Sequence, residues 1–171
     1  MKLLKTLAIL SLATLSSQSF AVDGFQKLKF GASETEVRKA YKQCHWEKDK
    51  QEDDELYCTN FSLGTIKNTD AVFYFIDGKF ERVAIDIPVI NLEGIIQALS
   101  EKYSLSSQPK EKELANPQPN NIYDFGFDKD TILIRYAYDN DMTEDIFLIY
   151  TTSDFNDKLQ TKDAQSVKDQ L

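Results

Sequence analysis

His45 is the residue of this chain best suited to acid–base chemistry. It is the one histidine in the sequence, and histidine is the side chain whose unperturbed pKa lies nearest neutral pH. It directly follows Cys44, whose thiolate would be a nucleophile for such a base. If Cys44 is bonded to Cys58 instead, no thiolate remains, and no GxSxG segment supplies a serine. We therefore interpret His45 as a structural or exposed residue, and we expect the protein not to be an enzyme.

The two cysteines are expected to form a disulfide. Stable pairs form in oxidising compartments, whereas cytosolic cysteines are more often reactive or metal-binding. A bond between Cys44 and Cys58 would enclose 13 intervening residues, and closing such a loop stabilises a fold by about 3 kcal/mol. Zinc bound by Cys44, His45 and Cys58 is the alternative, which a single histidine and the lack of paired CxxC spacing disfavour. We expect no metal and no cofactor.

Acidic side chains gather in two segments. The first, EKDKQEDDE at residues 47–55, lies inside the predicted disulfide loop; it suits Ca²⁺, a basic partner surface, or simply a solvated run of charge. The second, DNDMTED at residues 139–145, lacks the glycine and the distal glutamate of an EF-hand loop. No pair of carboxylates can be assigned to glycoside hydrolysis from spacing alone. The DFG string at 124–126 lacks the other kinase motifs.

Trp46 stands beside the first acidic segment, where its burial is difficult to arrange. Tryptophan and tyrosine are enriched where partners bind most tightly. The sequence therefore predicts a partner-binding loop around the disulfide. Its predicted residues are Trp46, Glu47, Asp49, Glu52, Asp53, Asp54 and Tyr57.

The first 21 residues are typical of a cleavable export signal. Lys2 and Lys5 form a positive end, an apolar run spans residues 7–15, and small residues at Ser19 and Ala21 suit a signal peptidase. The run is too short for a bilayer-spanning helix. With no cysteine at the cleavage point, we expect a free, periplasmic or secreted protein rather than a lipoprotein.

Residues 22–171 carry 18 basic and 28 acidic side chains, a formal net charge of −10. A field of this sign repels nucleic acid and anionic lipid, whose binding needs lysine and arginine. We therefore expect a protein partner, one with a basic surface, and no membrane insertion after cleavage. The length suits a single domain at 22–153, with halves 25–88 and 89–153, followed by a polar tail or surface helix at 154–171.

Spacing predicts the elements of the first half. Ser33 and Glu36 form a capping box that begins a helix over 33–43. Strands are expected at 56–63, 71–76 and 80–87, the last two joined at Asp77-Gly78. A two-residue loop would pair Phe75 with Phe80; we favour a bulged three-residue loop, which gives the hairpin a cleaner apolar face.

The second half repeats this order. Pro88 ends the preceding strand, and Asn91 is expected to cap a helix that runs toward Tyr103. A polar loop at 106–121 leads to strands at 121–127, 131–139 and 145–152. A four-residue turn over 128–131 would set Asp124 opposite Arg135. We predict an α+β fold of tandem α-β-β-β units, with helices packed on one face of an antiparallel sheet.

The segment FGASETEV, residues 30–37, resembles the openings of two exported families. These are the beta-lactamase inhibitor protein family, built of two tandem α-β repeats, and the BamE-like (SmpA/OmlA) envelope proteins, built of two helices and a three-stranded sheet. BamE-like proteins are lipoproteins, which the missing lipobox cysteine disfavours. The first resemblance implies partner binding without catalysis. We therefore expect an inhibitor or immunity-type protein, with an envelope assembly factor, or less plausibly a hydrolase, as the alternatives.

Overall fold

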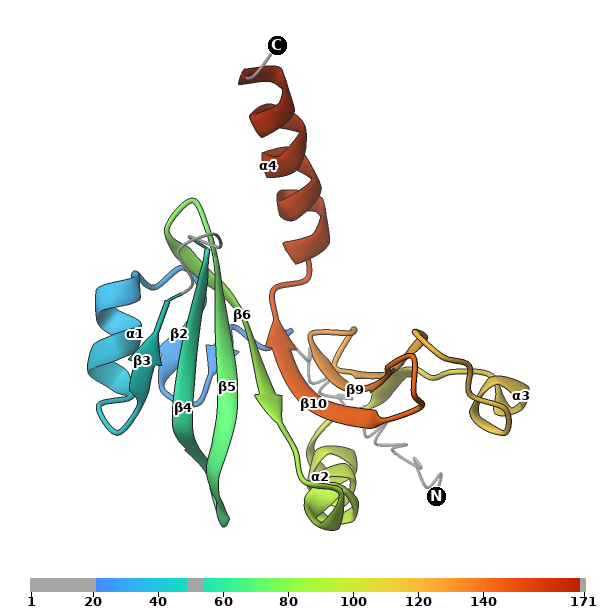
Figure 1. Ribbon diagram of the computed structural model, residues 1–171. Coiled ribbons are helices and arrows are strands. Elements are labelled where there is room, and N and C mark those ends of the chain that lie inside the picture. Colours follow the sequence, from blue (N-terminus) through green and yellow to red (C-terminus); the bar gives the residue numbers. More distant parts are fainter. Residues whose placement is uncertain (1–20, 49–53, 170–171) are drawn as a thin grey trace, which may run out of the picture.

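The computed structural model describes residues 21–48 and 54–169, which form an α+β fold around one large antiparallel sheet (Figure 1). Eight strands pair in the order β3-β4-β5-β6-β10-β9-β8-β7. They are β3 (His45–Glu47), β4 (Glu55–Leu63), β5 (Ile66–Ile76), β6 (Lys79–Asp86), β7 (Leu105–Ser107), β8 (Ile122–Phe127), β9 (Ile132–Tyr138) and β10 (Glu144–Thr151). A separate two-stranded ribbon is formed by β1 (Gly24–Phe25) and β2 (Leu28–Lys29).

Helices alternate with blocks of strands along the chain. Helix α1 (Glu34–Ala40) precedes β3 to β6, and α2 (Val89–Lys102) precedes β7 to β10. The short α3 (Glu111–Leu114) lies between β7 and β8, and α4 (Phe155–Asp169) follows β10. The prediction of three strands after each helix was wrong, because a three-residue edge strand comes first in both blocks. Neither edge strand has enough residues to show an alternating pattern in the sequence.

Helix α1 begins as its capping box predicts. Glu36 N–H is the donor to Ser33 Oγ at 3.4 Å, and Ser33 N–H donates to the Glu36 carboxylate at 2.8 Å. The helix ends at Ala40, three residues before the predicted end. Tyr41 then turns into the core, where its ring centroid lies 5.2 Å from that of Phe73. Helix α1 ends early because the Tyr41 ring is packed into the core.

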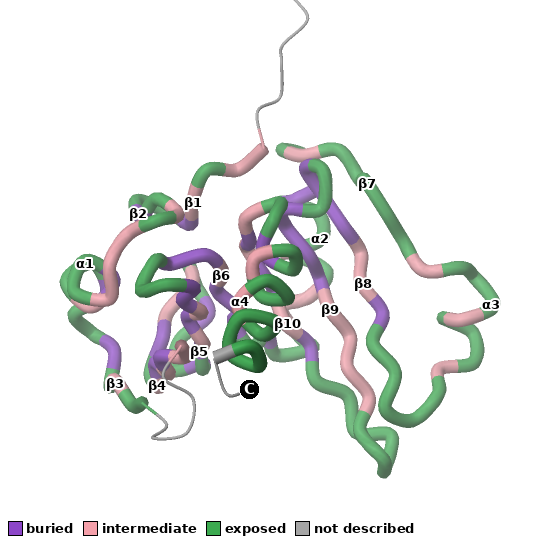
Figure 2. Tube along the Cα trace, turned by 90° about the horizontal axis from the view of Figure 1, so that it is seen from above, coloured by how far each residue is buried: buried purple, intermediate pink, exposed green. Residues whose placement is uncertain are grey.

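The main hydrophobic core lies on one face of the sheet. It contains the buried side chains of Phe61, Phe73, Phe80, Val83 and Ile85, together with Val37 of α1 and Leu99 of α2. The β1–β2 ribbon covers part of the same face through Phe25 and Leu28. Figure 2 shows buried positions concentrated in the central strands and exposed positions along α3 and most of α4. Val37 is the buried residue of α1, and Leu99 is that of α2.

The β5–β6 hairpin has the two-residue loop of one predicted alternative and a bulge like that of the other, but within the strand. Ile76 pairs with Lys79 and Phe75 with Phe80, so the loop holds two residues, Asp77 and Gly78, both with positive φ. The preferred three-residue loop was therefore wrong. A register shift follows within the strands, between the pairs Phe75↔Phe80 and Tyr74↔Arg82, and leaves Glu81 as the extra residue. The expected apolar face forms because the bulge occurs inside β6 rather than in the turn.

The β8–β9 hairpin has the predicted register. Phe127 pairs with Ile132, Tyr123 with Tyr136, and Asp124 with Arg135. Residues 128–130 of the turn all have positive φ, a conformation that aspartate tolerates better than most residues. The opposite-charge pair thus identified this register correctly.

Three other boundaries differ from expectation. Helix α2 begins at Val89 with Pro88 at its N-cap and no side-chain cap, so Asn91 is not the capping residue. Strand β5 begins five residues earlier than predicted, at Ile66. The expected polar loop 106–121 contains α3 and the end of β7. The tail is a helix, α4, which projects from the end of β10 (Figure 1).

No helix within residues 21–48 and 54–169 is both long and apolar enough to cross a membrane. The predicted export signal lies outside the described residues apart from Ala21.

Candidate functional site

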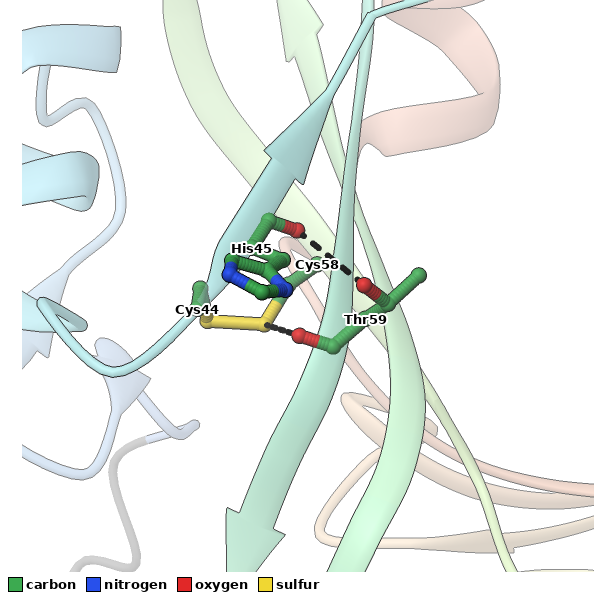
Figure 3. Close-up of a disulfide and its surroundings, with 4 residues drawn as sticks. All are labelled: Cys44, His45, Cys58 and Thr59. Carbon is green, nitrogen blue, oxygen red and sulfur yellow. Dashed lines mark hydrogen bonds between the residues drawn. A yellow bond between two sulfur atoms is a disulfide. The ribbon is translucent and has the colours of Figure 1, made fainter.

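Cys44 and Cys58 form the predicted disulfide, which fastens the start of β3 to β4 (Figure 3). Both cysteines are buried, at 7% and 1% exposure. His45 is exposed beside them, and its carbonyl oxygen accepts a hydrogen bond from Thr59 Oγ1 at 3.5 Å. Because both sulfurs are bonded to each other, neither zinc ligation nor a thiolate nucleophile is available at this position.

Those predicted partner-binding residues that the structure describes do not form one surface. Trp46 pairs with Cys58 and Glu47 with Tyr57 across β3 and β4, so Trp46 and Tyr57 lie on opposite faces of the sheet. The Trp46 ring packs edge-on against Phe73 in the core, with its centroid 5.5 Å away. Asp49, Glu52 and Asp53 lie outside the described residues. Of the members that the structure describes, Asp54 and Tyr57 line a groove on the sheet.

A groove of about 910 Å³ lies on the sheet face opposite the main core. Its floor is a second, smaller hydrophobic cluster built on Ala84, Leu133 and Ile149, with Tyr74 and Phe147 packed beside it. Phe155 and Leu159 of α4 form one wall. The groove is also lined by polar residues and one further apolar residue: Asp54, Glu55, Tyr57, Arg82, Ile122, Arg135 and Asp163. Six neighbouring strands, β4, β5, β6, β10, β9 and β8, and the first part of α4 therefore meet at one concave surface.

Arg82 is the most unusual side chain of this groove. Its guanidinium lies 3.6 Å from the centroid of the Phe155 ring, donates from Nε to Thr151 Oγ1 at 3.0 Å, and donates from Nη2 to the Asn156 side-chain oxygen at 3.3 Å. All of these partners are neutral. Burial, and then the charge of nearby Arg135, lowers the pKa of Arg82 to about 10. The groove thus holds a half-buried cation whose hydrogen bonds and ring contact within the described chain are with neutral groups, while the Asp124 carboxylate acts on it electrostatically.

Arg135 is held differently. Its Nε and Nη2 donate to the two oxygens of Asp124 at 2.8 and 2.7 Å, a bidentate pair between β9 and β8. These hydrogen bonds raise the pKa of Arg135 despite its partial burial. Asp124 pairs with Arg135 and holds its side chain in place in the groove wall. The guanidinium of Arg82 donates to neutral groups and can attract a hydrogen-bond acceptor of a ligand.

Ion pairs fasten the base of α4 beside the groove. Lys158 Nζ lies 2.7 Å from Glu81, the bulged and nearly buried residue of β6, and 3.1 Å from Asp154. Lys162 pairs with Asp54, which precedes β4. Beyond this point α4 is exposed, with Val167 at 59%. The helix wall of the groove is therefore anchored at its first two turns.

Polar and apolar groups lie together in this groove. Within residues 21–48 and 54–169, no group of three or more His, Cys, Asp or Glu side chains is placed to hold a metal ion. The acidic segment 139–145 uses Asp139 to order its own turn, since its carboxylate accepts from the backbone N–H groups of Asp141 and Thr143 at 2.8 and 2.7 Å. The groove combines a half-buried cation, tyrosine side chains and an apolar floor, which suits recognition of a ligand.

Sequence reasoning missed Arg82, Phe147, Ile149 and Phe155. A signal existed in β6, where FERVAID places Arg82 at a strand position alternating with apolar residues. The pairing of Arg82 with Thr151 joins strands 69 residues apart, and this contact has no local signature. The groove could therefore not be predicted from the sequence, because it depends on β6 and β10 being neighbours in the sheet.

Comparisons with known proteins give a family without an assigned activity. A family model described as "Uncharacterised protein" matches residues 25–170. A protein of Haemophilus influenzae (strain Rd), described as an uncharacterized protein, is 75% identical over 171 residues and covers 100% of both chains. No solved structure matches the chain.

Proposed function

This chain belongs to the family of uncharacterised proteins whose model spans residues 25–170, and we propose that it is an exported, non-catalytic protein that binds and blocks a partner protein. The proposed binding surface is the groove beside α4. The observation that carries the proposal is Arg82, a half-buried guanidinium that lines the groove and whose hydrogen bonds and ring contact among the described residues are with neutral groups.

A peptide segment of the partner fits this groove chemically. A backbone carbonyl or carboxylate of the segment would accept hydrogen bonds from Arg82 and relieve the cost of its burial. An apolar side chain of the same segment would cover Ile122, Phe147 and Leu159, which are still partly exposed. The volume of about 910 Å³ admits a short segment rather than a whole domain.

Charge supports a basic partner surface around that segment. Asp54, Glu55 and Asp163 stand along the groove, and residues 22–171 carry a net charge of −10. Basic groups flanking the inserted segment would be attracted to these acids, chiefly accelerating association. An inhibitor or immunity protein that acts on a basic enzyme or toxin would need such a groove with acidic residues along it.

We further propose that the protein is a tandem repeat. The block α1-β3-β4-β5-β6 is followed by α2-β7-β8-β9-β10, and the sheet order places the last strands of the two blocks side by side. In this arrangement the groove spans the junction between the repeats, since Arg82 comes from β6 and Ile149 from β10. A partner would thus contact both halves.

The test compares two matched variants on one helix. Leu159 lines the groove and is 40% exposed, whereas Val167 lies outside the groove and is 59% exposed. The mature protein would be used to capture partners from envelope extract, and each candidate would be purified and titrated by calorimetry. Leu159→Asp should weaken binding of the true partner at least 10-fold, and Val167→Asp less than 2-fold.

Two further readouts complete the test. Binding should weaken as salt rises from about 50 to 500 mM, because exposed charges are screened within a shorter Debye length. The partner's own enzymatic or toxic activity should fall when the wild-type protein is added. Equal binding by the two variants, or binding that leaves partner activity unchanged, would refute the proposal.

A further inference from the structure

The backbone of Val22 contacts a distant, buried carboxylate. Val22 N–H donates to Asp128 Oδ2 at 2.8 Å across a sequence separation of 106 residues. Asp128 is only 5% exposed, and it begins the turn between β8 and β9. The side chain also lies 3.4 Å from Thr131 Oγ1, which acts as a donor. This turn therefore presents its carboxylate to the start of the described chain.

Residues 22–32 form a strap across the core face of the sheet. Phe25 is 2% exposed, and its ring centroid lies 4.9 Å from that of Tyr150. At the far end, Gly31 N–H donates to the Phe80 carbonyl at 2.7 Å, and Phe80 N–H donates to the Ala32 carbonyl at 2.8 Å. The strap is thus fixed to β6 at one end and to the Asp128 turn at the other.

We propose that cleavage of the Ala21–Val22 bond creates an amino terminus that forms an ion pair with Asp128. This inference rests on the export proposed above. Water adds to the Ala21 carbonyl carbon, the C–N bond breaks, Ala21 leaves as a carboxylate, and the Val22 nitrogen becomes an α-ammonium group. The donor that already contacts Asp128 thereby gains a positive charge without having to move.

The change in charge alters the energetics of the contact. A buried carboxylate is costly unless it is hydrogen-bonded and paired. A charge-assisted hydrogen bond is shorter and roughly twice as strong as one from a neutral amide. Val22, Tyr103, Asp128 and Tyr150 are among the residues that line a cavity of about 1210 Å³, so an α-ammonium group on Val22 would have room beside the Asp128 carboxylate. Processing would therefore tighten the strap against the second half of the sheet.

The experiment compares amino termini in the presence and absence of the Asp128 carboxylate. One protein begins at Val22, and a second begins three residues earlier, at Ser19, which restores an amide at Val22. Each is made with Asp128 and with Asp128→Asn, and the four thermal midpoints are measured. The Val22 form should melt about 3 to 6 °C above the Ser19 form, and Asp128→Asn should reduce this gap to less than about 1 °C.

A matched control is Asp77→Asn. Asp77 also begins a hairpin turn, with φ 51° against 50° for Asp128, and asparagine tolerates this conformation. In this variant the gap between the two amino termini should persist. If Asp128→Asn fails to fold, acetylating the α-amino group of the Val22 protein removes the charge instead, and should abolish the gap. A gap that is absent, or that survives both changes, overturns the inference.

Mass spectrometry of protein from cells separates this inference from the export proposal. A native amino terminus at Val22 supports both. Retention of residues 1–21 contradicts export itself. Cleavage elsewhere, or a Val22 terminus with no thermal gap, leaves export standing and overturns the ion pair.

Discussion

Reducing the Cys44–Cys58 bond should lower stability through the unfolded chain. The bond encloses a loop with a sequence separation of 14 residues. For a loop of about 15 residues, the freed conformational entropy of the unfolded state costs about 3 kcal/mol of folding free energy. In a domain of this size each kcal/mol shifts the melting midpoint by about 2–4 °C, so the reduced protein should melt about 6–12 °C lower. Alanine at both positions should cost up to about 2 kcal/mol more, because two buried sulfurs are lost.

The assay is guanidinium unfolding of the oxidised protein, the reduced protein, and the double variant Cys44→Ala/Cys58→Ala. The reduced protein should unfold at a lower midpoint and with a larger m-value, because its unfolded state exposes more surface. Oxidised and reduced forms with the same midpoint would refute the entropic argument. A lowered midpoint with an unchanged m-value would instead indicate that the bond acts on the folded state.

Three further results are expected. Ser33→Ala should destabilise the protein by about 1 kcal/mol, because it removes the capping box of α1; denaturation that matches wild type would contradict this role. Arg135→Met should cost about 1–2 kcal/mol by leaving Asp124 partly buried without its partner, and Asp124→Asn in the same chain should recover part of the loss in a double-mutant cycle. Burial, with a smaller contribution from Tyr103, raises the pKa of Tyr150 to about 12. The unfolded phenol ionises near pH 10 and the folded one does not, so the contribution of Tyr150 to stability should be constant below pH 10 and be lost between pH 10 and 12, a decline that Tyr150→Phe should reduce.

Local features of the fold were predictable from sequence. Ser33 and Glu36 predicted the start of α1, and the opposite charges of Asp124 and Arg135 predicted the register of β8 and β9. The disulfide was predicted from two cysteines and an expected export signal, and the bond is confirmed. Each of these predictions rests on residues close together in the sequence or on the known chemistry of a residue type, so the sequence alone contains its physical cause.

The long-range features were not predictable. Pairing of β6 with β10 brings Arg82 beside Thr151, and this contact depends on how the two halves of the sheet join. Trp46 was expected to be hard to bury, yet its ring reaches Phe73 because β3 adds to the sheet edge. The three-residue length of β3 gave no alternation to indicate this pairing. The sequence predicted a site at the acidic loop, whereas the candidate site in the structure is the groove on the sheet face opposite the main core. Asp54 and Tyr57 belong to both.

Site-specific photo-crosslinking in living cells tests the proposed groove most directly. A photoreactive phenylalanine analogue would replace Ile122, which lines the groove and is 56% exposed, and in a separate strain Leu105, which is 51% exposed and does not line it. The account predicts a discrete crosslink to one exported protein from position 122, lost when Leu159→Asp is added, and none from position 105. Identical products from both positions, or no product from position 122, would contradict binding at this groove.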